Sequence, residues 1–359
     1  MLQRRNYGHY RLAVVGLAKR LPIWRDGDVG ESAFAAAGVS VVAPRSVRVS
    51  LTDRCDLACL YCRPSRSDGY LESKLDDRAW GVMLAGLARA GVRRIRFTGG
   101  EPLLYRGLEQ VVAEAVALGF EDVAVTTNAT RLAARAAGLR AAGLQRITVS
   151  LDSLDPARFA HLTRGGRLAD VLAGLEAALA TGFDEVKLNC VVLRGENDDE
   201  LGDIVRFAWA RGIVPRFLEV MPVGEGARLV ADGLVTVREM RERLGELLDP
   251  GALEAEPNRG PARYVRARHD ARLRVGFISG TSDTFCAGCD RLRVAADGFV
   301  RPCLSKNDGT SARLPAEAGD PAAIAAAVDR AWALKPDGLH WKGCTEESAR
   351  DVSMRAVGG

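Results

Sequence analysis

The sequence predicts an α/β protein built as an incomplete (β/α)6 barrel of the TIM type, with a C-terminal extension around a second group of cysteines. Candidate strands alternate with segments of helical composition from residue 46 onward, which is typical of a parallel sheet. No glycine-rich dinucleotide fingerprint accompanies them, so a barrel-like closure is favoured over a doubly wound sheet. Further cysteines follow the last of these strands and predict the extension.

The individual elements follow from runs of β-branched residues and from the helical composition between them. Strands are expected at 46–51, 93–97, 122–126, 145–150, 185–191 and 214–220, with helices at about 74–91, 106–118, 131–142, 169–182 and 198–211. Beyond these, we expect a loop at 221–226, a helix at 236–247, a strand region at 262–279 and an Ala-rich helix at 321–334. The predicted domains are an N-terminal extension (1–45), the barrel (46–225) and a C-terminal substrate and second-metal region (226–359).

The composition is that of an ordinary globular protein and excludes several function classes. Of the 359 residues, 47% are hydrophobic and 27% are charged, so disorder is not expected. The net charge of +4 is too small to indicate a nucleic-acid or membrane surface. Residues 1–25 hold no apolar run long enough for a signal peptide, and eight cysteines without such a signal indicate a reducing compartment. We therefore expect a cytoplasmic protein without nucleic-acid or membrane partners.

Charged residues recur on one face of several predicted strands. Side chains alternate along a strand, so Arg94 and Arg96 share a face, as do Glu185, Lys187 and Asn189. Strands of a buried parallel sheet are normally apolar, because an unpaired buried charge is costly. The pattern therefore predicts a polar cavity suited to an anion, unless some of the arginines cap strand ends at the surface.

The first predicted strand is followed by three cysteines with the spacing C-x3-C-x2-C: Cys55, Cys59 and Cys62. Thiolates are soft ligands that select zinc, copper or iron–sulfur clusters. A structural zinc site normally needs four ligands, and no fourth Cys or His lies nearby. A four-iron cluster held by three cysteines would keep one iron open to a reactant. The other interpretations are an incomplete zinc site and buried thiols.

This motif, with Tyr61 before its last cysteine, resembles the signature of radical S-adenosylmethionine (SAM) enzymes. The resemblance implies a [4Fe–4S] cluster whose open iron binds SAM and cleaves it to methionine and a 5′-deoxyadenosyl radical. Within that superfamily, residues 48–55 (RVSLTDRC) are similar to the MoaA family of GTP 3′,8-cyclases, which act in molybdenum cofactor biosynthesis. The likeness extends over about 46–359.

A second group with the spacing C-x2-C-x13-C consists of Cys286, Cys289 and Cys303. From the spacing alone, a zinc site is an equally good interpretation, completed by Cys344, His340 or His269. The resemblance favours a second metal site of the cluster type, a [4Fe–4S] cluster whose open iron faces the purine of the substrate.

The resemblance also implies binding residues. Those for SAM are Tyr61, Gly100, Glu101, Thr126 and Ser150. Those for GTP are Arg48, Arg94, Arg96, Lys187, Arg216, Arg291 and Arg293, and the planar fork of arginine suits phosphate oxygens. Gly100 and Glu101 belong to a TGGEP segment that by itself could be only a tight turn. The terminal Gly358-Gly359 would reach the active site, or else be a flexible end.

Five residues depart from the family pattern. Asp56 replaces the usual Asn, Arg63 the usual Met, and Tyr105 the usual Arg. Ala129 replaces the usual Gly, and Asp290 stands where Asn or Thr is usual. None of the replacements removes a predicted ligand.

The resulting hypothesis is a radical SAM lyase, a GTP 3′,8-cyclase that forms (8S)-3′,8-cyclo-7,8-dihydroguanosine 5′-triphosphate by attack of a C3′ radical on C8 of guanine. Implied partners are a reductant such as flavodoxin or ferredoxin, a downstream cyclic pyranopterin monophosphate synthase, and a second copy of the chain in a homodimer. Two alternatives stay open. One is a radical SAM paralogue acting on another substrate, such as a peptide; the other is a zinc-stapled nucleotide-binding module without redox chemistry.

Overall fold

The computed structural model of the chain describes residues 45–67, 69–256, 260–283, 285–286, 289–335 and 353–354. The chain divides into two units, Met1–Val42 and Ala43–Gly359, and all described residues belong to the second. Apart from Arg45, the predicted N-terminal extension lies outside the described residues, as do Cys344, His340 and Gly358-Gly359. None of the described helices is long and apolar enough to cross a membrane.

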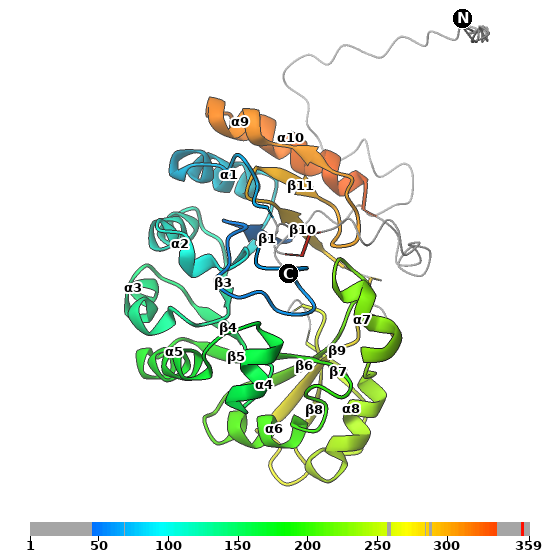
Figure 1. Ribbon diagram of the computed structural model, residues 1–359. Coiled ribbons are helices and arrows are strands. Elements are labelled where there is room, and N and C mark those ends of the chain that lie inside the picture. Colours follow the sequence, from blue (N-terminus) through cyan, green and yellow to red (C-terminus); the bar gives the residue numbers. More distant parts are fainter. Residues whose placement is uncertain are drawn as a thin grey trace, which may run out of the picture. The chain divides into compact units, whose positions relative to one another are not determined.

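Six parallel strands form the centre of the sheet and follow one another in sequence order (Figure 1). They are β1 (Ser46–Ser50), β2 (Arg94–Thr98), β3 (Asp122–Thr127), β4 (Arg146–Ser150), β5 (Glu185–Val192) and β6 (Val214–Glu219). Each pairs in parallel with the next. The predicted α/β class with a mostly parallel sheet is confirmed, and each strand begins and ends within one residue of its expected bounds.

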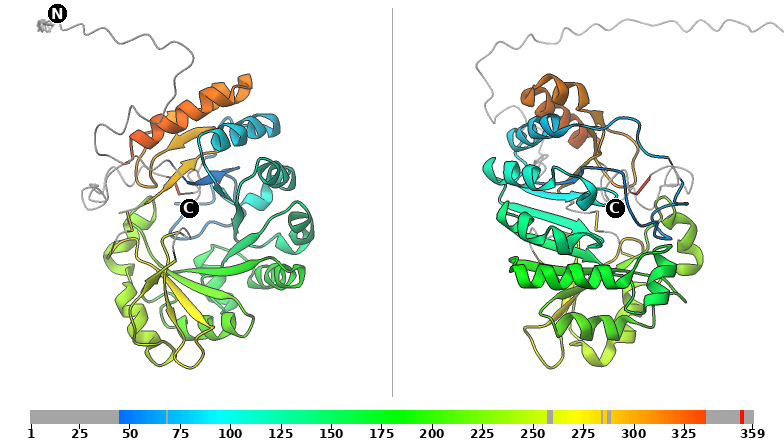
Figure 2. Two further views of the ribbon diagram at one scale, coloured as in Figure 1. Left: turned by 180° about the vertical axis from the view of Figure 1, so that it is seen from behind. Right: turned by 60° about the vertical axis from the view of Figure 1, so that its left-hand side comes forward.

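The helices between these strands cover one face of the sheet (Figure 2). They are α1 (Asp77–Arg89), α2 (Leu108–Ala117), α3 (Ala136–Ala141), α4 (Pro156–Leu162), α5 (Leu168–Thr181) and α6 (Leu201–Trp209), with short 3-10 turns at Pro102–Leu104 and Leu132–Ala134. Asp76 begins α1 by accepting the N–H of Ala79 at 2.8 Å. Helix α4 was not predicted, because its seven residues are too few to show a helical period.

The C-terminal region adds strands to both ends of the same sheet. Beyond β6 lie β9 (Arg274–Ile278), β8 (Arg263–Arg266) and β7 (Glu254–Ala255); beyond β1 lie β10 (Arg291–Val294), β11 (Phe299–Arg301) and β12 (Thr310–Ser311). The helices of this region are α7 (Gly226–Gly233), α8 (Val237–Leu244), α9 (Arg313–Ala318) and α10 (Pro321–Ala333), with a 3-10 turn at Gly245–Leu247. Strand β10 runs parallel to β1, so the segment of the second cysteine group lies beside the first strand of the sheet.

The sequence analysis predicted this region only in part, and two of the differences have a clear physical cause. The single strand region expected at 262–279 is a hairpin of β8 and β9, because Asp270 turns the chain by accepting the N–H of Arg272 at 2.9 Å. Strand β10 was not predicted, because Arg291 and Arg293 interrupt its apolar pattern.

Gly86 of α1 determines how closely α10 packs on that helix. A Cβ added at Gly86 would lie 2.4 Å from the Cβ of Ile324, which is fully buried. We expect Gly86→Ala to lower the free energy of unfolding by about 1–3 kcal/mol, because overpacking outweighs the gain in helix propensity. Urea denaturation measures the change. Gly138→Ala in α3 is the control, since the nearest atom there is 3.6 Å from the added Cβ. Equal effects of the two variants would contradict this account of the packing.

Candidate active site

A cavity of about 300 Å³ lies against the inner face of the parallel strands. Arg48 and Arg96 line it, whereas the alternating Val47, Val49 and Phe97 belong to the apolar core under the helices. The predicted site residues that line it are Cys55, Cys59, Cys62, Cys286, Cys289, Cys303, Tyr61, Gly100, Glu101, Thr126, Ser150, Arg48, Arg94, Arg96, Arg216, Arg291 and Arg293. The remaining one, Lys187, is not among the lining residues. The fold thus gathers residues from both halves of the sequence around one space.

The two cysteine groups lie toward opposite ends of this cavity. The first group follows the C-terminal end of β1, whereas Cys289 precedes the N-terminal end of β10. Because β1 and β10 are parallel, with Arg48 beside Arg293, these two ends point in opposite directions. Cys303 returns to the same end as Cys289, because β11 runs antiparallel to β10.

The loop of the first cysteine group is fastened to the segment after α4. The N–H of Ala58 donates to the carbonyl oxygen of Thr163 at 3.1 Å. The guanidinium of Arg164 donates to the carbonyl oxygen of Arg63 at 2.6 Å. These contacts fix the path of the backbone from Cys55 to Cys62, and therefore the directions of its thiols.

The donor set of this loop fits an iron–sulfur cluster. Burial, and then the charge of Glu101, raises the pKa of Cys55 well above its usual range; burial and Asp152 do the same for Cys59. Such thiols become thiolates only beside a strong positive charge. Among the described residues, no three His, Cys, Asp or Glu side chains are arranged to hold a single metal ion. In a cluster each thiolate binds its own iron, so the three need not converge on one point.

Tyr61, between the second and third cysteines, is held by a carboxylate that the sequence analysis did not single out. Its hydroxyl donates to Asp152 Oδ2 at 2.7 Å, and the N–H of Val191 donates to Asp152 Oδ1 at 2.9 Å. Burial raises the pKa of Asp152 to about 6. Asp152 follows β4, two residues after Ser150, so its place at the carboxyl end of a strand was the available signal.

The TGGEP segment needs both glycines, because it passes very close to the cysteine loop. A Cβ at Gly99 would lie 2.4 Å from the carbonyl oxygen of Thr52, and one at Gly100 would lie 2.3 Å from that of Arg54. Gly99 also has φ +157°, which disfavours a side chain. The turn therefore presents its backbone to the cavity right beside the first cysteine group.

Glu101 uses its carboxylate to join the ends of two strands. It accepts hydrogen bonds from the Thr127 hydroxyl and the Asn128 N–H at 2.7 Å, and from the N–H of Leu103 at 2.9 Å. Burial raises its pKa to about 7. Its predicted contact with SAM stays a prediction, and the structure adds this role in holding β2 to β3.

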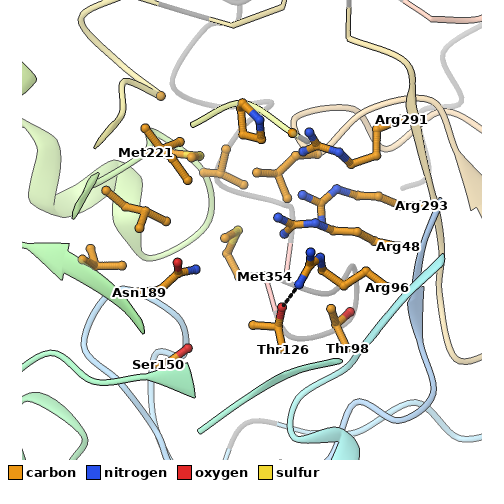
Figure 3. A pocket seen from close by; sticks show the side chains of 18 of the residues that line it. Arg48, Arg96, Thr98, Thr126, Ser150, Asn189, Met221, Arg291, Arg293 and Met354 are labelled. Carbon is orange, nitrogen blue, oxygen red and sulfur yellow. Dashed lines mark hydrogen bonds between the residues drawn. The ribbon is translucent and has the colours of Figure 1, made fainter. Parts of the chain in front are cut away.

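A row of arginines crosses the cavity between the two cysteine groups. In register, Arg48 of β1 lies between Arg293 of β10 and Arg96 of β2, and Figure 3 shows their guanidinium groups together with that of Arg291. Burial, and then repulsion from Arg293, Arg291 and Arg96, lowers the pKa of Arg48 well below its usual range. Burial and Arg216 lower the pKa of Arg96 to about 9, and burial and Arg291 lower that of Arg293 to about 10. Several like charges that repel one another around one cavity favour a bound polyanion.

The other predicted basic residues have protein partners. Arg94 forms an ion pair with Asp290, the residue after Cys289. Arg216 donates to the Thr148 hydroxyl at 3.1 Å. The Nζ of Lys187 lies 3.0 Å from Glu185 Oε2, and burial lowers its pKa to about 8. Contact of Lys187 with a nucleotide stays a prediction.

The departures from the family pattern are accommodated locally. Asp56 accepts from the side chains of Asn128 at 2.8 Å and Thr130 at 2.7 Å. Ala129 has φ +62°, a conformation that suits the usual glycine. Tyr105 donates to Asp77 and is not among the residues lining the cavity.

Two methionines that line the cavity were also missed, Met221 and Met354. They pack with Val223 and Leu304. Met354 is far along the sequence from the other lining residues, and no local sequence pattern predicts its place at the cavity (Figure 3).

Glu219, the last residue of β6, holds the start of α8 and the loop that follows β9. This buried carboxylate accepts the N–H of Val237 at 2.8 Å, of Thr281 at 2.9 Å and of Ser282 at 2.8 Å. We expect Glu219→Gln to lower the free energy of unfolding by about 3 kcal/mol, because an amide NH2 would face these donors. Denaturant unfolding tests this, with Glu225→Gln as control. Glu225 makes a helical surface pair with Arg228, so a change below about 0.5 kcal/mol is expected there. Similar losses in both variants would contradict the role given to Glu219.

Comparisons with known proteins agree with this site. Residues 49–208 match the model of the radical SAM superfamily, and residues 213–341 match that of the Molybdenum Cofactor Synthesis C family. A GTP 3′,8-cyclase of Heliobacterium modesticaldum is 43% identical over 277 residues, 76% of this chain and 84% of that protein. A GTP 3′,8-cyclase of Pelotomaculum thermopropionicum is 40% identical over 301 residues, 82% and 92% of the two chains.

Among solved structures, Streptococcus suis SuiB bound to S-adenosylmethionine has a similar fold, with a TM-score of 0.56 at 16% identity. The match covers 73% of this chain and 60% of that one. By its domain models and by its identity to these relatives over most of their length, the chain belongs to the GTP 3′,8-cyclase family of radical SAM enzymes.

Proposed function

We propose that the protein converts GTP to (8S)-3′,8-cyclo-7,8-dihydroguanosine 5′-triphosphate, the first step of molybdenum cofactor biosynthesis. The relatives at about 40% identity carry this activity in their names. The observation that carries the proposal for this chain is the row of Arg48, Arg96, Arg291 and Arg293, which lines the cavity between the two cysteine groups. A triphosphate would neutralise their mutual repulsion, and their planar forks suit its oxygens.

Two [4Fe–4S] clusters would be held in this arrangement, one by Cys55, Cys59 and Cys62 and the other by Cys286, Cys289 and Cys303. SAM would contact Tyr61, Gly100, Glu101, Thr126 and Ser150. When bound, the first cluster and SAM supply the 5′-deoxyadenosyl radical that takes the C3′ hydrogen of GTP. Two observations support this placement: the Gly99-Gly100 backbone passes beside the first loop, and all six cysteines line the same cavity.

The contribution of the chain itself is positioning. The arginine row would hold the triphosphate, so that the nucleotide spans the cavity with its purine toward one cysteine group and its sugar toward the other. Arg96 is aimed by hydrogen bonds to the hydroxyls of Thr126 at 3.3 Å and Thr148 at 3.2 Å. A fixed guanidinium loses less freedom when phosphate binds, which favours binding.

We also propose that the curved sheet is the incomplete (β/α)6 barrel of the TIM type, with a barrel domain at 46–225 and a substrate and second-cluster region at 226–359. The two family matches divide between 208 and 213, close to that boundary. A flavodoxin- or ferredoxin-type reductant, a downstream cyclic pyranopterin monophosphate synthase, a homodimeric state and a cytoplasmic location stay predictions.

The testing experiment is anaerobic reconstitution with iron and sulfide, followed by incubation with reductant, SAM and GTP. The hydrogen atom removed from C3′ is balanced by an electron and a proton delivered to the cyclised nucleotide, so the product has the mass of GTP but a different chromatographic position. We expect this compound to appear together with 5′-deoxyadenosine. Formation of 5′-deoxyadenosine without any product from GTP would instead favour the paralogue acting on another substrate.

A further inference from the structure

A lysine outside the predicted site residues joins the two segments that carry the second cysteine group. Lys335 lies just after α10, which packs on α1 through Ile324 and Gly86. Its N–H donates to the carbonyl oxygen of Trp332 at 2.9 Å, and its Nζ lies 5.3 Å from the centre of the Trp332 ring. The side chain is half-buried and lines the cavity. It is therefore an anchored group and not a freely solvated lysine.

The Nζ of Lys335 donates to two backbone carbonyl oxygens, that of Arg291 at 2.7 Å and that of Pro302 at 2.9 Å. Arg291 is two residues after Cys289, and Pro302 directly precedes Cys303. One ammonium group thus bridges the two chain segments that carry these thiols.

The position of this bridge follows from the β10–β11 hairpin. The antiparallel ladder pairs Arg293 with Arg301, and Pro302 has no N–H with which to continue it. The two strands are therefore not hydrogen-bonded to each other at the end of the hairpin where the chain leads to Cys289 and to Cys303. Two carbonyl oxygens remain at this open end, and the ammonium, with three donors, ties them together.

The same ammonium also lies beside the Cys289 thiol. The ammonium of Lys335 and the guanidinium of Arg291 are the positive charges that act most strongly on this thiol. A positive charge here would offset the negative charge of thiolates bound to a metal centre.

We propose that Lys335 is a positioning residue of the second cluster: it closes the β10–β11 hairpin and so holds together the two chain segments through which Cys289 and Cys303 would bind one cluster. The inference rests on the second cluster of the proposed function and goes beyond it, because it assigns to the end of α10 the task of shaping that site.

The test isolates the second site in the full chain. A parent variant with Cys55, Cys59 and Cys62 all replaced by alanine can bind a cluster only through the second group. Lys335→Met, Lys335→Arg and, as control, Arg330→Met are then added to the parent. Arg330 is exposed on α10, so its replacement removes the same charge from the same helix. Each protein is reconstituted with limiting ferrous iron and sulfide, its iron content and electron paramagnetic resonance spectrum are recorded, and its folding is checked by circular dichroism.

We expect Lys335→Met to hold at most about half the iron of the parent, in keeping with the roughly 10–100-fold loss of metal affinity typical when an outer-shell partner is removed. Lys335→Arg should regain part of that iron, and Arg330→Met should match the parent. Full iron and an unchanged spectrum in Lys335→Met would overturn the proposal, as would an equal loss in Arg330→Met. If the parent variant bound no iron, there would be no second cluster and the inference would be wrong. GTP turnover by the unmodified protein reports separately on the proposed function.

Discussion

Cys59→Ala is expected to abolish formation of 5′-deoxyadenosine from SAM, down to the rate measured without enzyme. Cys59 lies between Cys55 and Cys62 in the first cysteine loop. The described loop has no further cysteine that could replace it as a ligand. Two thiolates leave a second iron without a protein ligand, so the cluster should not be retained. Iron content after anaerobic reconstitution and 5′-deoxyadenosine by liquid chromatography measure the two consequences.

The matched control is Cys190→Ala, which removes a fully buried thiol from β5 of the same sheet. Its Sγ lies 3.8 Å from the carbonyl oxygen of Asp152 and takes no part in either cysteine group. Iron content and turnover should stay close to those of the unmodified protein. If Cys59→Ala kept its iron and cleaved SAM normally, or if Cys190→Ala lost as much, the first metal site would be assigned to the wrong residues.

The second large effect is expected for Arg48→Met. Removal of one guanidinium from the proposed phosphate site should lower kcat/KM for GTP about 10–100-fold, since a charge-assisted hydrogen bond is worth about 1.5–3 kcal/mol. The free energy of unfolding of the ligand-free protein should stay the same or rise, because the variant relieves the repulsion among Arg48, Arg293 and Arg96. Steady-state kinetics and denaturant unfolding of the same preparations give both numbers.

The comparison variant is Arg274→Met. Arg274 forms ion pairs with Glu256 and Glu185 and does not line the cavity. Loss of this side chain should lower the free energy of unfolding, whereas kcat/KM for GTP should change little. If Arg48→Met instead destabilised the protein and left kcat/KM unchanged, the arginine row would be structural and no anion site.

The sequence was sufficient to predict the features that depend on local pattern. The period of β-branched residues located the six parallel strands, and the alternation of side chains predicted that Arg94 and Arg96 face a polar cavity. The same alternation did not determine the contacts of Lys187, because it defines the face of a strand but not the partners on it. Glu185, on the same face of β5, lies within 3.0 Å of that ammonium.

Features that depend on pairing between distant segments could not be predicted from the sequence. Strand β10 lies beside β1 although about 240 residues separate them, and its arginines hide its strand character. Asp152, Met354 and Lys335 enter the site only through the tertiary fold. Each stands in an unremarkable local context, at the end of a strand, near the end of the chain or just after a helix.

The central claim is that GTP lies along the arginine row with its ribose toward the first cysteine group. The most direct test uses GTP deuterated at C3′, with GTP deuterated at C2′ as control, and records the mass of the 5′-deoxyadenosine that each yields. We expect deuterium to appear in 5′-deoxyadenosine from the C3′-labelled nucleotide and not from the C2′-labelled one. Unlabelled 5′-deoxyadenosine from both nucleotides, or label arriving from C2′, would contradict this placement.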